Sequence, residues 1–219
     1  MKNYSKSVSF CRFARSYSIL EKFVFKDTLE KARFAYLDSI SEAKKILLLG
    51  EGDGRFLEKL TSINKNCQIT VLDASPIMLG LAKEKVPVTF QGKIHFCEED
   101  VTIFPFACEA FDVVVSHFFL DCFTEETLTA LLKNISSTLH PGGKWLIADF
   151  VEPSLDTIRS INQFISLRIL YVFFRLICGI EAHKVVSPNK MLKAHGLHES
   201  HCISFSKGLL KSLIYIKQA

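Results

Sequence analysis

Three closely spaced glycines and a later aspartate are the residues of this sequence best suited to hold a ligand. Gly50, Gly52 and Gly54 directly follow the apolar run at 46–49, and Asp73 comes 23 residues after the first glycine. Glycine lets the backbone turn sharply and approach a ligand, because no Cβ stands in the way. A carboxylate at the end of the second apolar run can bind both hydroxyls of a ribose. These residues predict a site for a ligand that contains a nucleoside.

The glycine spacing argues against a dinucleotide. The dinucleotide fingerprint is G-x-G-x-x-G, whereas the sequence reads G-x-G-x-G and places Arg55 where the third glycine of that fingerprint would be. The structural alternative is an ordinary strand-to-helix turn with three glycines and no ligand.

The surrounding pattern alternates between buried strands and amphipathic helices. Lys45–Leu60 predicts a strand, a glycine turn and a helix, because an apolar run without alternation is typical of a buried parallel strand. Ser75 and Thr124 are predicted to be N-caps of two further helices, the second of which runs through Leu139. Further strands are expected at 68–72, 94–97, 111–116 and 144–150, and an antiparallel hairpin at 201–205 and 213–217.

Length and composition indicate one folded domain. The chain has 219 residues, of which 48% are hydrophobic and 23% charged. A net charge of +4, with no block of Lys and Arg and no zinc-finger spacing, argues against a nucleic-acid partner. The seven cysteines form no C-x-x-C motif, so we interpret them as free thiols in a reducing compartment, and we expect a cytoplasmic protein.

Three motifs in order carry a family resemblance. They are the G-x-G-x-G turn with Asp73, the string FDVVVS at 111–116, and LHPGG at 139–143. Together they resemble class I S-adenosylmethionine-dependent methyltransferases, in particular the ubiquinone/menaquinone C-methyltransferase branch. The resemblance implies an α/β fold: a Rossmann-like, seven-stranded, mostly parallel sheet with an antiparallel last strand and helices on both faces. It divides the single domain 1–219 into N-terminal helices (1–42), a cofactor-binding core (43–150), an acceptor-lid insertion (151–192) and a C-terminal hairpin (193–219).

The resemblance also implies roles for individual residues. Asp73 would hold the ribose, and Asp100 with Val101 would read the adenine of S-adenosyl-L-methionine. His117 and Asp121 follow the fourth strand, where a general base could reach the acceptor; packing and helix capping are the alternatives for these two. The predicted cofactor-binding residues are Gly50, Glu51, Gly52, Asp53, Gly54, Asp73, Ala74, Met78, Asp100, Val101 and Ser116.

One position departs from the family. An acid usually stands two residues before the first glycine, where it helps to hold the amino group of the donor, and this chain has Leu48 there. Glu51 or Asp53 could replace it. The predicted function is methyl transfer to a small, apolar or aromatic acceptor, and the alternative is a non-catalytic cofactor-binding accessory protein with the same fold.

Three other segments allow more than one interpretation. The apolar run Ile169–Phe174 is a buried helix, the lining of an acceptor pocket, or a peripheral contact with a membrane surface. Residues 1–20 have the composition of a mitochondrial transit peptide, which would place the protein in the matrix, but a folded helix is favoured. A metal site at His195, His198, His201 and Cys202 is disfavoured, because a glycine interrupts the spacing, and no metal is predicted.

Overall fold

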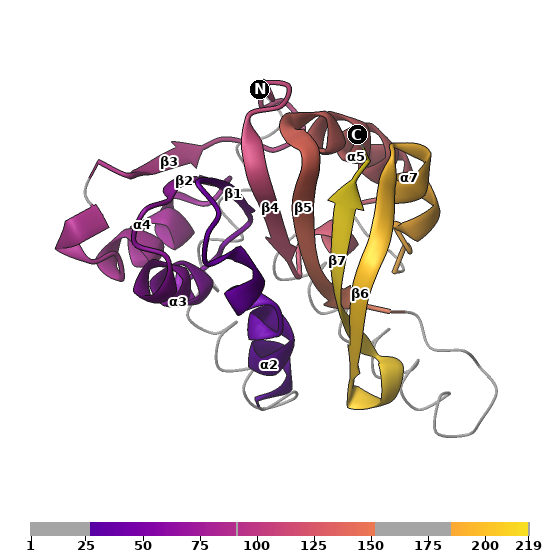
Figure 1. Ribbon diagram of the computed structural model, residues 1–219, viewed down its shortest axis with the longest axis horizontal. Coiled ribbons are helices and arrows are strands. Elements are labelled where there is room, and N and C mark those ends of the chain that lie inside the picture. Colours follow the sequence, from indigo (N-terminus) through magenta and orange to yellow (C-terminus); the bar gives the residue numbers. More distant parts are fainter. Residues whose placement is uncertain (1–26, 91, 152–184, 219) are drawn as a thin grey trace.

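A seven-stranded sheet organises the protein. The computed structural model describes residues 27–90, 92–151 and 185–218. The strand order is β3-β2-β1-β4-β5-β7-β6 (Figure 1). The five strands from β3 to β5 are parallel, and β7 is antiparallel to both β5 and β6, which confirms the predicted fold. The strands are β1 (Lys45–Leu49), β2 (Gln68–Asp73), β3 (Ile94–Glu98), β4 (Phe111–His117), β5 (Leu139–Phe150), β6 (Leu197–Phe205) and β7 (Leu210–Lys217).

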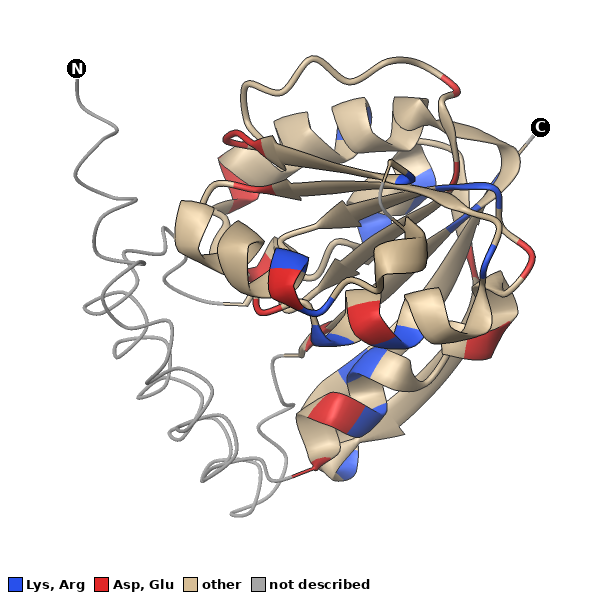
Figure 2. Cartoon of the chain, turned by 90° about the vertical axis from the view of Figure 1, so that its left-hand side faces the viewer, with Lys and Arg blue, Asp and Glu red and all other residues tan. Residues whose placement is uncertain are grey.

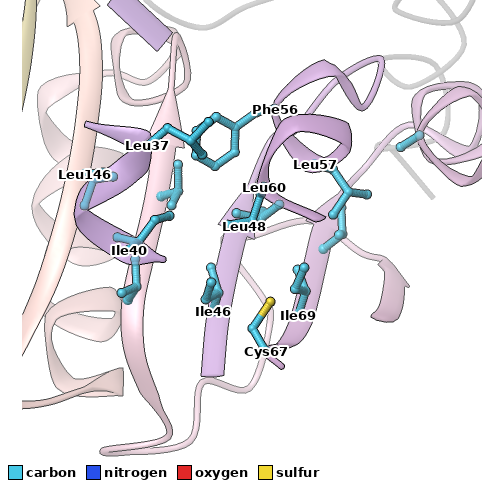
Figure 3. Close-up of a cluster of buried hydrophobic side chains, with 14 of the residues drawn as sticks. Leu37, Ile40, Ile46, Leu48, Phe56, Leu57, Leu60, Cys67, Ile69 and Leu146 are labelled. Carbon is cyan, nitrogen blue, oxygen red and sulfur yellow. The ribbon is translucent and has the colours of Figure 1, made fainter. Parts of the chain in front are cut away.

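Helices cover both faces, because neighbouring residues of the central strands point to opposite sides of the sheet. Ile46 and Leu48 of β1 belong to the core beneath α3 (Arg55–Ile63) and α4 (Pro76–Glu84), as Figure 3 shows for part of this cluster. Leu47 and Leu49 belong to the opposite core, beneath α5 (Glu125–Thr138) and α7 (Asn189–Ala194). Short 3₁₀ turns occur at η1 (Leu37–Ile40), η2 (Val88–Phe90), η3 (Leu120–Cys122) and η4 (Ser206–Gly208).

The two predicted helix caps are confirmed. The Ser75 hydroxyl accepts a hydrogen bond from the N–H of Met78 at 3.3 Å, with proline in the first turn of α4. The Thr124 hydroxyl accepts one from the N–H of Thr127 at 3.3 Å and begins α5. Each cap satisfies one of the N–H groups that a helix leaves unpaired at its start.

Two element boundaries differ from the prediction. Helix α5 ends at Thr138, because Leu139 already pairs with Phe111 in the sheet; the register then shifts before Lys144 pairs with Val113. Strand β6 begins at Leu197 instead of His201, because the buried Leu197 pairs with Lys217 and a second register shift lies between residues 199 and 201. The histidine-rich segment therefore continues into a strand.

The N-terminal segment made of α2 (Thr28–Phe34) and η1 is bonded to β7 and β5. Helix α2 is held by Ser212, whose hydroxyl donates a 2.6 Å hydrogen bond to the carbonyl of Ala32. The Lys144 ammonium donates to the Ser39 carbonyl at 2.8 Å, just after α2. The predictions for residues 1–20 and for Ile169–Phe174 lie outside the described residues. Within the described ranges, no helix is both long enough and apolar enough to cross a membrane.

Candidate functional site

The glycine turn lies at the carboxyl end of β1 and is shaped by left-handed backbone conformations. The φ angles of Gly50, Gly52 and Gly54 are +60°, +71° and +82°, a region that side chains other than hydrogen disfavour. A Cβ on Gly54 would lie 2.5 Å from the Cα of Ala82 in α4, and a Cβ on Gly50 would collide with the ring of Phe119. Nothing lies within 4 Å of a Cβ placed on Gly52. Two of the glycines are therefore required by packing, and Gly52 faces open space.

Asp73 stands at the tip of β2 beside this turn. One carboxylate oxygen accepts a hydrogen bond from the N–H of Ser75 at 2.9 Å, and the other accepts one from the N–H of Gly52 at 3.3 Å. Burial raises the pKa of Asp73 to about 6, against the lowering effect of these two bonds. Each oxygen of an ionised carboxylate can accept a second hydrogen bond, so Asp73 has room for two hydroxyl donors.

Glu51 lies in the glycine loop, and its side chain reaches the first turn of helix α3. Its Oε1 atom accepts hydrogen bonds from the N–H groups of Phe56 at 3.0 Å and Leu57 at 2.9 Å, where the helix dipole favours a negative charge. Burial raises the pKa of Glu51 to about 7, although these bonds and the charge of Arg33 lower it. Leu48 is 1% exposed and lies in the apolar core (Figure 3). The acid beside the turn is therefore Glu51 of the loop, and the position in β1 where the family usually has an acid holds the buried Leu48.

A small cavity opens between the glycine turn, β4 and helix α2. Two of its residues carry opposite charges, Glu51 and Arg33. The guanidinium of Arg33 also lies 5.4 Å from the centre of the Phe118 ring, which fixes its position through a cation–π contact. The residues that line the cavity are Arg33, Leu49, Gly50, Glu51, Val115 and His117.

His117 lies in this cavity but is also packed against an aromatic ring. Its imidazole meets the ring of Phe56 edge-on, with 4.7 Å between the centroids. Burial and the nearby charge of Arg33 lower the pKa of His117 well below its usual value. The imidazole is therefore neutral at physiological pH. It both packs against Phe56 and lines the cavity beside the glycine turn.

Two other candidates direct their side chains elsewhere. Asp53 forms ion pairs with Arg55 at 2.9 Å and Lys85 at 3.6 Å; burial would raise its pKa, but the bond and charge of Arg55 bring it below the usual value. Ser116 is fully buried, and its hydroxyl accepts a hydrogen bond from Nε1 of Trp145 at 2.9 Å. The side chains of Asp53 and Ser116 therefore do not line the cavity.

The candidates on the β2 and β3 side keep local roles. One oxygen of Asp100 accepts hydrogen bonds from the N–H of Thr102 at 2.9 Å and from its hydroxyl at 2.8 Å. Val101 and Met78 are buried, and Ala74 is exposed directly after Asp73. None of these four residues lines the cavity beside the glycine turn.

A second pair of carboxyl groups lies at the ends of β4 and β5. Asp121 belongs to the turn η3 and Asp149 to the end of β5, and both are 8% exposed. Burial and the charge of Asp121 raise the pKa of Asp149 well above its usual value. The sequence pointed to Asp121 but not to Asp149, although Asp149 carries the same signal as Asp73: an acid at the end of a buried strand. Arg33 was also missed, because nothing in its local pattern distinguishes it.

The histidine-rich segment does not assemble a metal site. His195 follows α7, while His198 and His201 lie exposed on β6. Across residues 27–90, 92–151 and 185–218, no three His, Cys, Asp or Glu side chains are grouped to hold a metal ion.

Part of the chain is similar to known proteins. Residues 46–143 match the family model described as "Methyltransferase domain". The ubiquinone/menaquinone biosynthesis C-methyltransferase UbiE of Haemophilus ducreyi is 30% identical over 133 residues, which cover 60% of this chain and 51% of that protein. UbiE of Wigglesworthia glossinidia brevipalpis is 28% identical over 189 residues, covering 80% and 75%. The chain thus spans about half the length of the first relative.

A solved structure has a similar fold. The N-methyltransferase NodS from Bradyrhizobium japonicum WM9, in complex with S-adenosyl-L-homocysteine, is similar with a TM-score of 0.64 and 19% identity, covering 87% of this chain and 88% of NodS. Residues 46–143 are therefore similar to methyltransferase domains, and the strand order and the glycine turn agree with this similarity.

Proposed function

We propose that this protein transfers a methyl group from S-adenosyl-L-methionine to a small, apolar or aromatic acceptor. The observation that carries the proposal is Asp73, a half-buried carboxylate that accepts hydrogen bonds from two backbone N–H groups beside the glycine turn. Ligands of open α/β sheets bind at the carboxyl ends of the strands, where the strand order reverses, and Asp73 and Gly50 lie at that edge.

The cavity beside the turn suits the amino-acid end of the donor. That end carries an ammonium and a carboxylate, and the cavity offers Glu51 and Arg33. In our proposal Glu51 accepts hydrogen bonds from the ammonium, Arg33 donates to the carboxylate, and Asp73 binds the ribose. Asp100 and Val101 receive the adenine. Glu51 then compensates for Leu48, the residue that first suggested a protein without turnover.

The chemistry asks for positioning more than for reactive side chains. A sulfonium methyl is electrophilic, so the rate depends chiefly on holding a nucleophile in line with the carbon–sulfur bond. Aromatic rings gather beyond β4, where the Phe118 and Phe150 rings lie 5.8 Å apart and the Phe119 and Phe123 rings 5.2 Å apart. These rings support an apolar or aromatic acceptor, as do relatives named for ubiquinone and menaquinone biosynthesis.

The test is calorimetric titration with S-adenosyl-L-methionine and S-adenosyl-L-homocysteine. We expect Asp73→Asn to weaken both by at least about tenfold, because a charged acceptor of the ribose hydroxyls is lost. The matched control is Glu98→Gln, an exposed acid that occupies the corresponding position on β3, directly in register with Asp73. NADH should not bind.

Two results would redirect the proposal. Equal affinity in Asp73→Asn and wild type would show that the ribose lies elsewhere. Tight donor binding without methyl transfer to any phenol, quinol or amine would favour the accessory-protein alternative.

We also propose a reducing, cytoplasmic location and acceptors other than nucleic acids. All five cysteines in the described part of the chain are free thiols. Basic and acidic residues are interspersed along the helices of the face shown in Figure 2. Proteomic fractionation and a nucleic-acid filter-binding assay would test these two points.

A further inference from the structure

The carboxyl pair at the ends of β4 and β5 is an unusual arrangement for a protein interior. Asp149 is 8% exposed, and neither of its buried carboxylate oxygens has a partner at good hydrogen-bond geometry among the described residues. The backbone N–H groups of Phe119 and Leu120 are near enough only to lower its pKa against the larger effect of burial. A buried ionised carboxylate without donors is costly, so such a group stays neutral or serves a ligand. The arrangement therefore calls for an explanation beyond packing.

Among the described residues, the charged side chains on the neighbouring elements do not pair with Asp149, and the backbone N–H groups of Phe119 and Leu120 offset only part of the effect of its burial. Lys211 of β7 is its register partner, yet it donates no hydrogen bond to either oxygen. His117 of β4 meets the ring of Phe56 edge-on, on the other face of the sheet. Arg33 of α2 lies over the ring of Phe118. The side chain that interacts with Asp149 is the carboxyl of Asp121, and a hydrogen bond between two carboxyls exists only when one of them is protonated.

The pair lies next to the proposed donor site. The N–H of Phe118 donates to the carbonyl of Ala148 at 2.7 Å, which brings Asp149 to the same sheet edge as the cavity residue His117. Between Phe118 and Asp121, Phe119 packs its ring against Gly50 of the glycine turn. One short segment therefore connects the turn to the acid pair.

We infer that Asp121 and Asp149 share one proton and form the site that binds and deprotonates an acceptor carrying an O–H or N–H group. This inference rests on the proposed methyl transfer and names the acceptor class for it. The pair carries one negative charge, so it can accept a hydrogen bond from such a group. Two carboxyls that share a proton cannot both ionise easily at short range, which keeps one acid and one base at the same place.

The step balances without a further reactant. The acceptor proton moves to the ionised carboxyl of the pair, and the lone pair on oxygen or nitrogen forms a bond to the methyl carbon. The carbon–sulfur bond breaks, and its electrons remain on sulfur as a neutral thioether. The pair is left with two protons and returns one of them to water when the product leaves.

The shared proton is tested by infrared spectroscopy at about pH 8.5, where Glu51 and Asp73, with pKa values of about 7 and about 6, are ionised. We expect the carbonyl stretch of a buried protonated carboxyl in the wild type and its loss in both Asp121→Asn and Asp149→Asn. The band should persist in Glu51→Gln. Absence of the band in the wild type, or its persistence in either aspartate variant, would overturn the inference.

The acceptor role is tested with phenol and toluene as probes, in the presence of saturating S-adenosyl-L-homocysteine. We expect phenol to bind at least tenfold more tightly than toluene in the wild type, and this ratio to approach one in Asp149→Leu, which keeps the branched shape of the side chain but has no oxygen atoms. An unchanged ratio would refute the acceptor role. Calorimetry with S-adenosyl-L-homocysteine distinguishes the two proposals. If the wild type does not bind it, the proposed function is contradicted. The infrared result tests the shared proton of Asp121 and Asp149 independently of donor binding.

Discussion

Buried carboxyl groups dominate the site at the level of single residues. Burial raises the pKa values of Asp73, Glu51 and Asp149, and each lies at or next to the carboxyl end of a strand. A desolvated carboxylate whose lone pairs are only partly used gains from further donors that a ligand supplies, because its desolvation has already occurred during folding. These residues are therefore prepared for a ligand with hydroxyl and ammonium groups.

Donor affinity should depend on pH through Asp73. Its pKa is raised to about 6, and the ribose hydroxyls need the ionised form. We expect the affinity for S-adenosyl-L-homocysteine to be constant above about pH 7.5 and to fall as the pH drops through 7 and 6, since Glu51 protonates in the same interval. Calorimetry from pH 5 to 8.5 measures this. In Asp73→Asn the part of the slope near pH 6 should disappear, and an unaltered slope would exclude Asp73 as its source.

The stability of the protein should depend on pH through Glu51. Burial raises its pKa from 4.5 to about 7, so the folded state binds this proton more tightly than the unfolded state does. Stability from this group is complete below about pH 4.5 and is lost as the pH rises through 7. We expect Glu51→Gln, whose amide oxygen can still accept from Phe56 and Leu57, to gain on the order of 2 kcal/mol relative to wild type between pH 5 and 8. Urea denaturation at each pH measures the difference, and a constant difference would contradict the assignment.

At the level of elements, the strand ends and the turns that follow them form the site. Two of the glycines in the turn are needed for different reasons, one for helix packing and one for the approach of a ligand, although the sequence does not distinguish them. Gly54 must be glycine because α4 packs against it, whereas Gly52 has open space in front of it. Packing and ligand approach are thus divided between neighbouring positions.

Alanine substitutions should expose this division. In Gly54→Ala, the new Cβ would lie 2.5 Å from the Cα of Ala82, and alanine would have to adopt a φ of +82°. We therefore expect the free energy of unfolding to fall by about 3 kcal/mol. Gly52→Ala suffers only the left-handed backbone penalty of about 1 kcal/mol, but we expect it to weaken donor binding by at least tenfold. Denaturation and calorimetry on both variants measure these effects. Donor binding of Gly52→Ala at wild-type strength would mean that no ligand approaches this residue.

Local patterns were sufficient to predict most elements. The caps at Ser75 and Thr124, the parallel strands and the final hairpin follow from signals within a few residues. The boundary at Leu139 was wrong, because its pairing with Phe111 is a contact between distant segments that overrides the helical pattern. Contacts of this kind leave no trace in local periodicity.

At the level of the whole molecule, the site depends on segments that lie far apart in the chain. Helix α2 lies beside the sheet (Figure 1). It is held there by the hydrogen bond between Ser212 and Ala32, 180 residues apart, and its residue Arg33 lines the cavity. The sequence predicted the glycine turn and Asp73 because they are neighbours of a recognisable motif. It could not predict Arg33 or the partnership of Asp149 with Asp121, because only the folded sheet brings these residues together.

The packing of α2 on the sheet can be weakened by a substitution at Ser212, which does not line the cavity. We expect Ser212→Ala to lower the free energy of unfolding by about 1 kcal/mol, because the buried hydrogen bond to the Ala32 carbonyl is lost. Donor affinity should fall as well, because Arg33 follows Ala32 directly. Ser204→Ala, on the exposed strand β6, is the control. Reduced stability with unchanged donor affinity would show that the position of Arg33 does not depend on this bond.

The contact between Phe119 and Gly50 has a kinetic consequence. The ring of Phe119 covers the first glycine of the turn, and Asp121 lies two residues further along the same segment. A donor that enters beside Gly50 must displace or reorient this ring and thereby adjusts the position of Asp121. We therefore expect ordered addition, with donor first and acceptor second. S-adenosyl-L-homocysteine would then compete with the donor and inhibit noncompetitively toward the acceptor, and initial-rate product inhibition would show whether the order is random instead.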